Sequence, residues 1–438
     1  MRKATSGRID VAFSEKRARF SLNVRFSIPA KGVTGIFGPP GCGKTTVARC
    51  IAGLERLSTG FCVIDGEVWQ DETTFRAPHL RPIGYVFKEP SLFPHLSVRR
   101  NLLYALRKRK PSPIAFDEVT ELLGIVSLLD RSPAHLSAGE RQGVAIGRAL
   151  LSQPRVLLMD EPLATLNGCA KREILPCLKR LNERLAVPTI YISHDMAQIE
   201  YLADHLVMME RGAITAAGPL HTLQSDPALP LAAGHEAAVS LDAVVGGYDG
   251  RYGLLILRLK GARLLVPAAP LAPGVHQRLR IAASDVSVSR EAPRSSTILN
   301  VFPARIKACF PLGASEITLV LALGTGGSGT NILARITRYA FDTLRLEDGE
   351  WTCSPSSSTS RWPRPLKRHR KPQSPPRQQE MPDRQASLLK ASKRIKILMA
   401  NLACTTPDSV EAILDVWNVI SIAYALSSDP RAIDRVSL

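Results

Sequence analysis

Apolar and polar residues change their spacing several times along the chain, and each change marks a predicted element. Residues 9–28 alternate apolar and polar side chains on either side of a polar turn, which predicts an antiparallel pair of strands. Short, almost uniformly apolar runs are typical of strands buried on both faces, and they lie at 33–37, 156–159 and 188–192. Helical spacing of apolar residues is found at 98–109, 115–129 and 171–185. This alternation predicts an α/β domain over 1–230, with an antiparallel β subdomain and a helical subdomain.

A different pattern covers residues 237–351, where short alternating strands are separated by glycine and proline turns. This pattern predicts a small all-β barrel or sandwich. Residues 352–386 are rich in Ser, Pro, Arg and Gln and almost lack apolar side chains, so they are predicted to form a disordered basic linker. Amphipathic spacing returns over 387–402 and 409–426 and predicts a helical tail over 387–438.

The composition narrows the class of protein. With 438 residues, of which 45% are hydrophobic, the chain is long enough for two or three globular domains. No run of about 18 apolar residues predicts a membrane span, and no apolar segment near residue 1 predicts a secretory signal. The eight cysteines have neither CxxC nor Cys/His metal spacing, which favours free thiols in a reducing cytosol over disulfides or zinc.

The positive charge is concentrated late in the chain. The formal net charge is +18, and residues 361–396 hold twelve Lys and Arg against Glu380 and Asp383. Such a stretch can bind nucleic acid through phosphates, but Trp362 is its only aromatic residue that could stack on bases. The sequence therefore disfavours a nucleic-acid partner.

A glycine-rich turn joins the predicted strand at 33–37 to a predicted helix. Its sequence, Gly38-Pro39-Pro40-Gly41-Cys42-Gly43-Lys44-Thr45-Thr46, has the spacing of a phosphate-binding loop. The glycines let backbone N–H groups turn toward phosphate oxygens, while Lys44 reaches the β- and γ-phosphates and Thr45 offers a hydroxyl to Mg²⁺. Phe13, in the preceding strands, is a candidate for stacking on the base, although core packing is the commoner role of a single Phe.

Two carboxylates follow the buried strand at 156–159. Downstream of a phosphate loop, Asp160 is suited to hold Mg²⁺ through water and Glu161 to polarise an attacking water. His194 ends the strand at 188–192, from where it can reach a γ-phosphate. Between loop and carboxylates, Ser137 and Glu140 have the spacing of a capping box at the start of a helix.

These motifs, in this order, resemble those of the ATP-binding-cassette ATPases, the motor subunits of transporters. The resemblance rests on the phosphate loop, Leu136-Ser137-Ala138-Gly139-Glu140, Asp160-Glu161 and His194. It covers about residues 1–230 and implies a P-loop NTPase core. Segments 85–98, 101–104 and 171–178 are similar to the ATPases of molybdate importers in particular. Segments 280–288 and 296–300 resemble that family's oligonucleotide-binding-type (OB-type) regulatory domain.

The resemblance implies ATP hydrolysis with Mg²⁺ by a head-to-tail homodimer, peripheral at the cytoplasmic face of the inner membrane. Lys44, Glu161 and His194 would be catalytic, and each phosphate loop would face the signature residues of the other subunit, which are Ser137, Ala138, Gly139 and Glu140. Dimer closure would drive integral membrane permease subunits, which receive their ion from a periplasmic binding protein. Molybdate is the implied ion, with sulfate and ferric iron open as alternatives, and an oxyanion is the implied ligand of the regulatory domain.

Several positions depart from the family pattern. Lys88 stands at the Q-loop position, where the family has Gln, and Asn167 stands at the D-loop position, where it has Asp. Ala138 replaces a signature Gly, and Leu299 stands beside Asn300 where the family has a cation. These changes leave a second hypothesis open, that the protein is a degenerate ATP-binding protein with weak or uncoupled hydrolysis.

Overall fold

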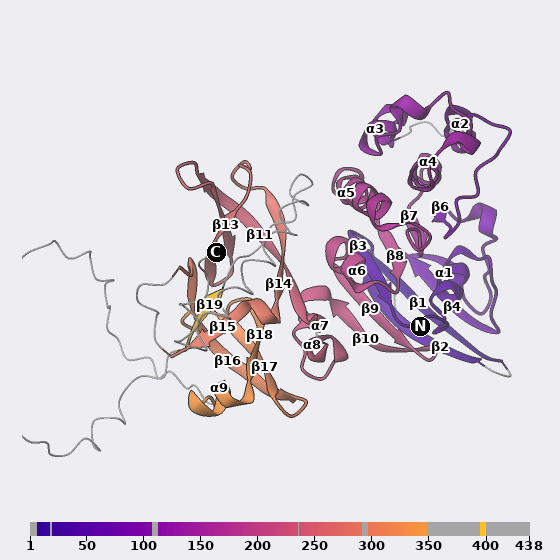
Figure 1. Cartoon of the computed structure of the whole chain (residues 1–438). Coiled ribbons are helices and arrows are strands. Elements are labelled where there is room, and N and C mark those ends of the chain that lie inside the picture. The colour runs from indigo at the N-terminus through magenta and orange to yellow at the C-terminus, as the bar shows by residue number, and fades with distance from the viewer. Residues whose placement is uncertain are drawn as a thin grey trace, which may run out of the picture.

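The computed structural model describes residues 7–17, 20–106, 113–234, 236–290 and 297–347, together with the backbone of a strand at 395–399. Within these ranges a mixed α/β domain lies beside an all-β domain (Figure 1). The predicted change of fold class after about residue 230 is therefore confirmed.

Ten strands of the α/β domain form one sheet, in the order β5-β4-β1-β2-β10-β9-β3-β8-β7-β6. The strands are β1 (Arg8–Arg17), β2 (Phe20–Pro29), β3 (Val33–Phe37), β4 (Thr59–Ile64), β5 (Glu67–Gln70), β6 (Ile83–Val86), β7 (Val156–Asp160), β8 (Thr189–Ser193), β9 (His205–Glu210) and β10 (Ala213–Pro219). The helices are α1 (Lys44–Ala52), α2 (Val98–Ala105), α3 (Phe116–Leu122), α4 (Ala138–Leu151), α5 (Gly168–Leu185), α6 (Met196–Leu202), α7 (Leu220–Gln224) and α8 (Pro230–Ala233). Short 3₁₀ turns are η1 (Pro78–Leu80), η2 (Val126–Leu128) and η3 (Pro133–His135).

The centre of this sheet is parallel and buried on both faces. β3 pairs in parallel with β8 and β9, and β7 pairs in parallel with β6 and β8. Every residue of β7 and β8 is buried, and alternate residues of β7 enter different cores. Leu157 and Met159 pack with residues of α4 and α5, whereas Val156 and Leu158 pack with residues of α1, β1 and β2. The parallel strands therefore end at one edge, where the predicted site residues follow them.

The helical subdomain differs from its prediction in one place. A single helix was expected over 115–129, but α3 ends at Leu122 and the short turn η2 follows it. Gly124 has a φ of +66°, a left-handed conformation that a helix cannot contain. None of the helices in the described ranges is long and apolar enough to cross a bilayer.

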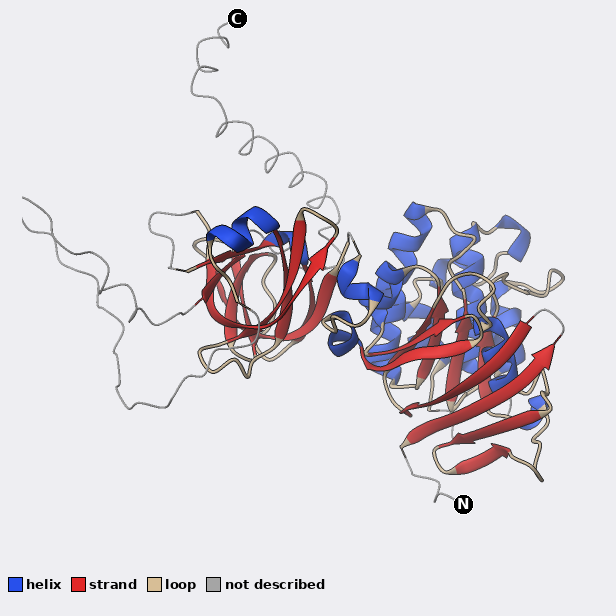
Figure 2. Ribbon diagram, turned by 90° about the horizontal axis from the view of Figure 1, so that it is seen from below, coloured by secondary structure: helices blue, strands red, loops and turns tan. Residues whose placement is uncertain are grey.

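The second domain is built from two sheets around one core. Their orders are β13-β12-β11-β14 and β15-β19-β16-β17-β18. The elements are β11 (Ala238–Asp249), β12 (Leu254–Leu259), β13 (Ala262–Pro267), β14 (His276–Ala282), η4 (Ala283–Asp285), β15 (Val286–Ser289), β16 (Asn300–Leu312), β17 (Glu316–Leu323), β18 (Asn331–Thr337), α9 (Arg338–Thr343) and β19 (Ile395–Met399). Figure 2 shows the strands curving around a common interior, which residues of both sheets fill. The predicted small all-β domain is confirmed.

The strand β19 comes from the tail of the chain. Its backbone pairs antiparallel with both β15 and β16. The sequence had predicted a helix over 387–402, so the structure corrects this prediction at 395–399. Ile-Lys-Ile-Leu-Met has β-branched residues two positions apart, a spacing that favours a strand once neighbouring strand edges are available. The predicted basic linker at 352–386 and the second predicted tail helix lie outside the described residues.

The two domains are joined by polar contacts between β14 and the end of α6. Arg278 donates to the carbonyl of Ala203 at 2.8 Å and to Asp204 at 2.6 Å. About one helical turn earlier in α6, Glu200 accepts a hydrogen bond from Arg280 of β14 at 2.7 Å. Burial raises the pKa of Glu200, and the charge of Arg280 opposes that shift. The all-β domain therefore holds the helix that begins two residues after His194.

Candidate nucleotide-binding site

The phosphate loop lies between the end of β3 and the start of α1. Gly43 is the residue before α1 and has a φ of +102°, so only glycine adopts this turn without strain. No side chain caps the helix, which leaves the first N–H groups of α1 available to an anion. Lys44 is 4% exposed, and its Nζ donates to the carbonyls of Gly38 at 2.7 Å and Pro39 at 3.0 Å. The Lys44 side chain therefore lies over the phosphate loop and contacts its backbone.

Asp160 ends β7 directly opposite Thr45 of α1. The Thr45 hydroxyl donates to Asp160 Oδ1 at 2.9 Å, and the Tyr85 hydroxyl from β6 donates to Oδ2 at 3.1 Å. Burial raises the pKa of Asp160, while these two hydrogen bonds oppose the shift. Carboxylate and hydroxyl oxygens are the ligands that Mg²⁺ prefers. In the described part of the chain, no group of three or more His, Cys, Asp or Glu side chains could hold a metal ion by itself.

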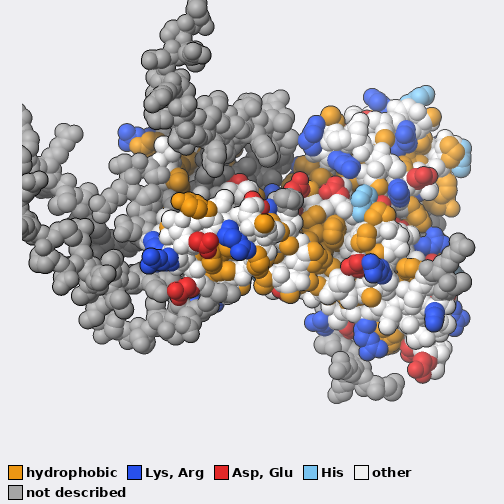
Figure 3. All heavy atoms as spheres, turned by 60° about the horizontal axis from the view of Figure 1, so that its bottom comes forward, with side chains coloured by type: hydrophobic (Ala, Val, Ile, Leu, Met, Phe, Trp, Pro, Cys, Tyr) orange, Lys and Arg blue, Asp and Glu red, His pale blue; other side chains and the backbone are white. Residues whose placement is uncertain are grey.

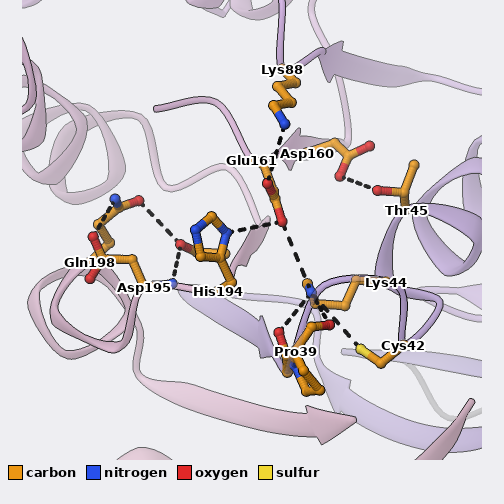
Figure 4. Close-up of polar contacts among 12 residues, drawn as sticks. Pro39, Cys42, Lys44, Thr45, Lys88, Asp160, Glu161, His194, Asp195 and Gln198 are labelled. Carbon is orange, nitrogen blue, oxygen red and sulfur yellow. Dashed lines mark hydrogen bonds and ion pairs between the residues drawn. The ribbon is translucent and has the colours of Figure 1, made fainter. Parts of the chain in front are cut away.

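Glu161 contacts two lysines and a histidine, which approach it from different sides (Figure 4). Its Oε1 is 3.2 Å from His194 Nδ1 and 4.0 Å from Lys44 Nζ, and its Oε2 is 4.0 Å from Lys88 Nζ. The Glu161 side chain is 18% exposed, whereas Lys88 is 56% exposed. Glu161 also has a φ of +47°, an uncommon conformation for a residue other than glycine. This backbone turn directs the carboxylate to the phosphate loop.

His194 is held by the turn between β8 and α6. Asp195 caps α6 by accepting from the N–H of Ala197 at 3.0 Å, and its own N–H donates to Ser193 Oγ at 3.0 Å. Gln198 donates to the second Asp195 oxygen at 2.8 Å. These bonds fix the backbone on both sides of His194, so the imidazole stays beside Glu161.

A cavity of about 240 Å³ opens onto these groups. Its lining consists of Phe20, Gly41, Gly43, Lys44, Thr45, Thr46 and Glu161. Phe13 does not reach it, because this residue is 1% exposed and packs in the core between β1, β2 and α1. The prediction that Phe13 stacks on the base is therefore wrong for this cavity, and its burial fits core packing, the commoner role of a single Phe. Phe20, which lines the cavity, was not named from the sequence, because strand alternation does not show which residues reach a cavity.

The signature residues lie away from this cavity. Ser137 accepts from the N–H of Glu140 at 3.2 Å, and Glu140 accepts from the N–H of Ser137 at 2.6 Å, so the predicted capping box starts α4. Ser137 and Ala138 are exposed and Gly139 is buried. Asn167 caps α5 by accepting from Ala170 at 2.9 Å, which is the capping role that an Asp would also perform. Within one chain, none of these residues lines the cavity.

In the all-β domain, the structure limits what Asn300 can bind. This side chain is 3% exposed, and both ends of its amide are bonded to Leu265, accepting from its N–H at 2.8 Å and donating to its carbonyl at 2.9 Å. Leu299 is 54% exposed. The amide therefore holds β13 of one sheet against the start of β16 of the other, and oxyanion binding by this domain stays a prediction.

Comparison with known proteins gives two family matches. Residues 22–164 match the ABC transporter family, and residues 296–352 match the TOBE domain. Among the relatives, molybdenum import ATP-binding protein ModC 1 of Bradyrhizobium diazoefficiens is 62% identical over 348 residues, which are 80% of this chain and 94% of that protein.

Two further relatives extend this result. ModC 2 of the same organism is 63% identical over 343 residues, which are 78% of this chain but 38% of the length of that protein. ModC of Rhodobacter capsulatus is 50% identical over 343 residues, which are 78% of this chain and 94% of that protein. Together with the P-loop fold and the all-β domain, these likenesses show that the chain belongs to the ABC transporter family, in its group of ModC ATP-binding proteins.

Proposed function

We propose that this protein hydrolyses ATP to drive the import of molybdate. The observation that carries the proposal is a cavity lined by Lys44, Thr45 and Glu161, with Asp160 bonded to Thr45 and His194 to Glu161 beside it. The choice of molybdate as the ion is supported by the relatives that are named molybdenum import ATP-binding proteins. Sulfate and ferric iron are the alternatives, since this subunit does not form the permeation path.

Each side chain has a distinct part in the proposed reaction. Phe20 stacks on the adenine, and the N–H groups of residues 41–46 bind the phosphates. Lys44 exchanges the carbonyls of Gly38 and Pro39 for phosphate oxygens. Thr45 and Asp160 hold Mg²⁺, which neutralises charge on the phosphates when bound. Glu161 orients the attacking water, and His194 donates to the γ-phosphate.

The exposed start of α4 supports a head-to-tail homodimer. Its N-terminal N–H groups and partial positive charge suit the γ-phosphate held by a second copy. Ala138 adds a methyl group to this end, but it is exposed and the buried Gly139 remains. In this dimer each ATP is bound by the phosphate loop of one subunit and by the signature residues of the other.

An apolar surface beside the Q-loop supports docking to a membrane permease. Phe87, Leu103 and Tyr104 are 42%, 44% and 67% exposed. The Tyr104 ring packs in a tilted arrangement against Phe93, with 4.6 Å between the ring centroids, and the Phe87 ring against Tyr85, with 4.4 Å. Such a cluster suits a protein partner, so we place the protein at the cytoplasmic face of the inner membrane through its permease. On the face in Figure 3, basic and acidic side chains of the described residues are interspersed, while the disfavouring of a nucleic-acid partner rests on the sequence alone.

Glu161→Gln tests the mechanism. This variant keeps the shape of the side chain but cannot accept a proton from water, so ATP should accumulate and hold two subunits together. Light scattering coupled to size-exclusion chromatography should show a dimer with ATP and a monomer with ADP. A variant that binds ATP and stays monomeric would contradict the dimer mechanism.

The second hypothesis, a degenerate ATP-binding protein, is favoured by the ammonium of Lys88 beside Glu161. Steady-state ATPase measurements with and without the membrane subunits separate the two hypotheses. Turnover stimulated by the permease supports the importer, whereas binding without turnover, restored by Lys88→Gln, supports the degenerate protein.

A further inference from the structure

Of the three side chains that contact Glu161, which are Lys44, Lys88 and His194, Lys88 is the one that the proposed reaction does not use. It lies after β6, in a segment tied to α4 by Gln142, which donates to the carbonyl of Phe87 at 3.3 Å, and by Arg148, which donates to that of Ser91 at 2.6 Å. Lys88 Nζ approaches Glu161 Oε2 at 4.0 Å, on the oxygen opposite to the one that faces Lys44 and His194. The two lysines therefore flank one carboxylate (Figure 4), that of Glu161, which lines the cavity.

Each ammonium group lies 4.0 Å from an oxygen of Glu161. A γ-phosphate that enters the cavity carries more charge than a carboxylate and offers three oxygens to these donors. Lys88 is 56% exposed, so its side chain has freedom to turn from Glu161 toward the phosphate. A β-phosphate alone sits one phosphate further into the loop and would leave Lys88 on Glu161.

We propose that Lys88 is a second γ-phosphate cation, which pairs with Glu161 in the nucleotide-free protein and moves to the γ-phosphate of ATP. This inference rests on the proposed function, because it requires the nucleotide to lie in the phosphate loop. Lys88 thereby makes the protein prefer ATP over ADP. Its transfer also releases one oxygen of Glu161 for the attacking water.

The test compares the binding of two nucleotides, independently of turnover. Dissociation constants of ADP and of the β,γ-imido analogue of ATP are measured by equilibrium dialysis for the full chain and for Lys88→Gln, Lys88→Arg and Lys31→Gln. Lys31 lies in the turn before β3, at the opposite end of that strand from the loop, so its variant controls for the loss of one positive charge.

We expect Lys88→Gln to lower the preference for the ATP analogue about tenfold, because a charge-assisted hydrogen bond to phosphate is lost. ADP binding should stay within about twofold, Lys88→Arg should keep the preference, and Lys31→Gln should match the native protein. The part of the preference for the ATP analogue that depends on Lys88 should decrease in high salt, since the Lys88 side chain is exposed.

Two results would overturn the inference: an unchanged preference in Lys88→Gln, or an equal loss of affinity for both nucleotides, which would mean that Lys88 only shapes the cavity. Failure of the premise that nucleotide lies in the phosphate loop looks different, because the native protein would then bind neither nucleotide, and loss of turnover alone leaves this binding test unaffected.

Discussion

At the scale of single residues, the different positions of two phenylalanines show what a sequence pattern can and cannot specify. Phe13 and Phe20 both lie in the first antiparallel pair, and both satisfy the alternation that predicts strands. Alternation assigns neighbouring residues to opposite faces, but the face that meets the core depends on how α1 packs on the sheet. Phe13 faces α1 and is buried, whereas Phe20 begins β2 at the cavity.

Substitution of the two phenylalanines should therefore have opposite effects. Phe20→Ala should weaken ATP binding by about tenfold through loss of stacking, with little change in thermal stability. Phe13→Ala should lower the free energy of unfolding by about 3–5 kcal/mol because it leaves a cavity in the core. Fluorescent-nucleotide titration and thermal melts measure the two quantities. If Phe13→Ala weakened binding without destabilising the fold, our assignment would be reversed.

At the scale of elements, the predictions that succeeded rest on residues whose local pattern allows one structure. The runs that became β7 and β8 are apolar at nearly every position, which only strands buried on both faces require. The phosphate loop was recognisable because its glycines and Lys44 are close in sequence. Tyr85, which donates to Asp160, was missed, since it is separated from that residue by α2, α3 and α4 and only the parallel pairing of β6 with β7 brings them together.

The helix of the phosphate loop depends on one buried arginine that follows η1. Arg81 is 4% exposed and donates to the carbonyls of Cys50 at 3.0 Å and Ile51 at 2.6 Å, at the end of α1. A cation at a helix C-terminus is favourable, and burial lowers the pKa of Arg81 without removing its charge at neutral pH.

Arg81→Met should leave the carbonyl of Ile51 without its donor and that of Cys50 with the N–H of Gly53 alone, and lower the free energy of unfolding by about 3 kcal/mol. The exposed Arg100 of α2 provides the matched control, since Arg100→Met removes the same charge from the surface. Urea unfolding followed by tryptophan fluorescence should separate the two variants, because Trp69 lies in the affected core. Equal midpoints would show that Arg81 contributes no more than a surface charge.

At the scale of the whole molecule, the junction of the two domains is electrostatic and should depend on pH. Because burial raises the folded-state pKa of Glu200, the contribution of this group to stability is full below its unfolded pKa and decreases as the pH rises through the folded value. Arg280 opposes this rise in the pKa of Glu200, so its ion pair contributes most to stability at pH values at which Glu200 is ionised.

Arg280→Ala should therefore destabilise the protein little at pH 4.5 and by about 1 kcal/mol at pH 7.5, a small value because Arg280 is 42% exposed. Thermal unfolding at the two pH values measures this difference. In a Glu200→Gln background the same substitution should lose its pH dependence. A loss that is equal at both pH values in the native background would place the effect of Arg280 elsewhere.

Helix α6 has a practical meaning for protein engineering. It is seven residues long, or about 10 Å. Asp195 caps its first turn. Near its other end, Glu200 pairs with Arg280, and Asp204, just after the helix, pairs with Arg278. An all-β domain transplanted from another transporter would bring its own residues to these positions. In a working chimera, Glu200 and Asp204 would then have to be exchanged together with Arg280 and Arg278, their partners on β14.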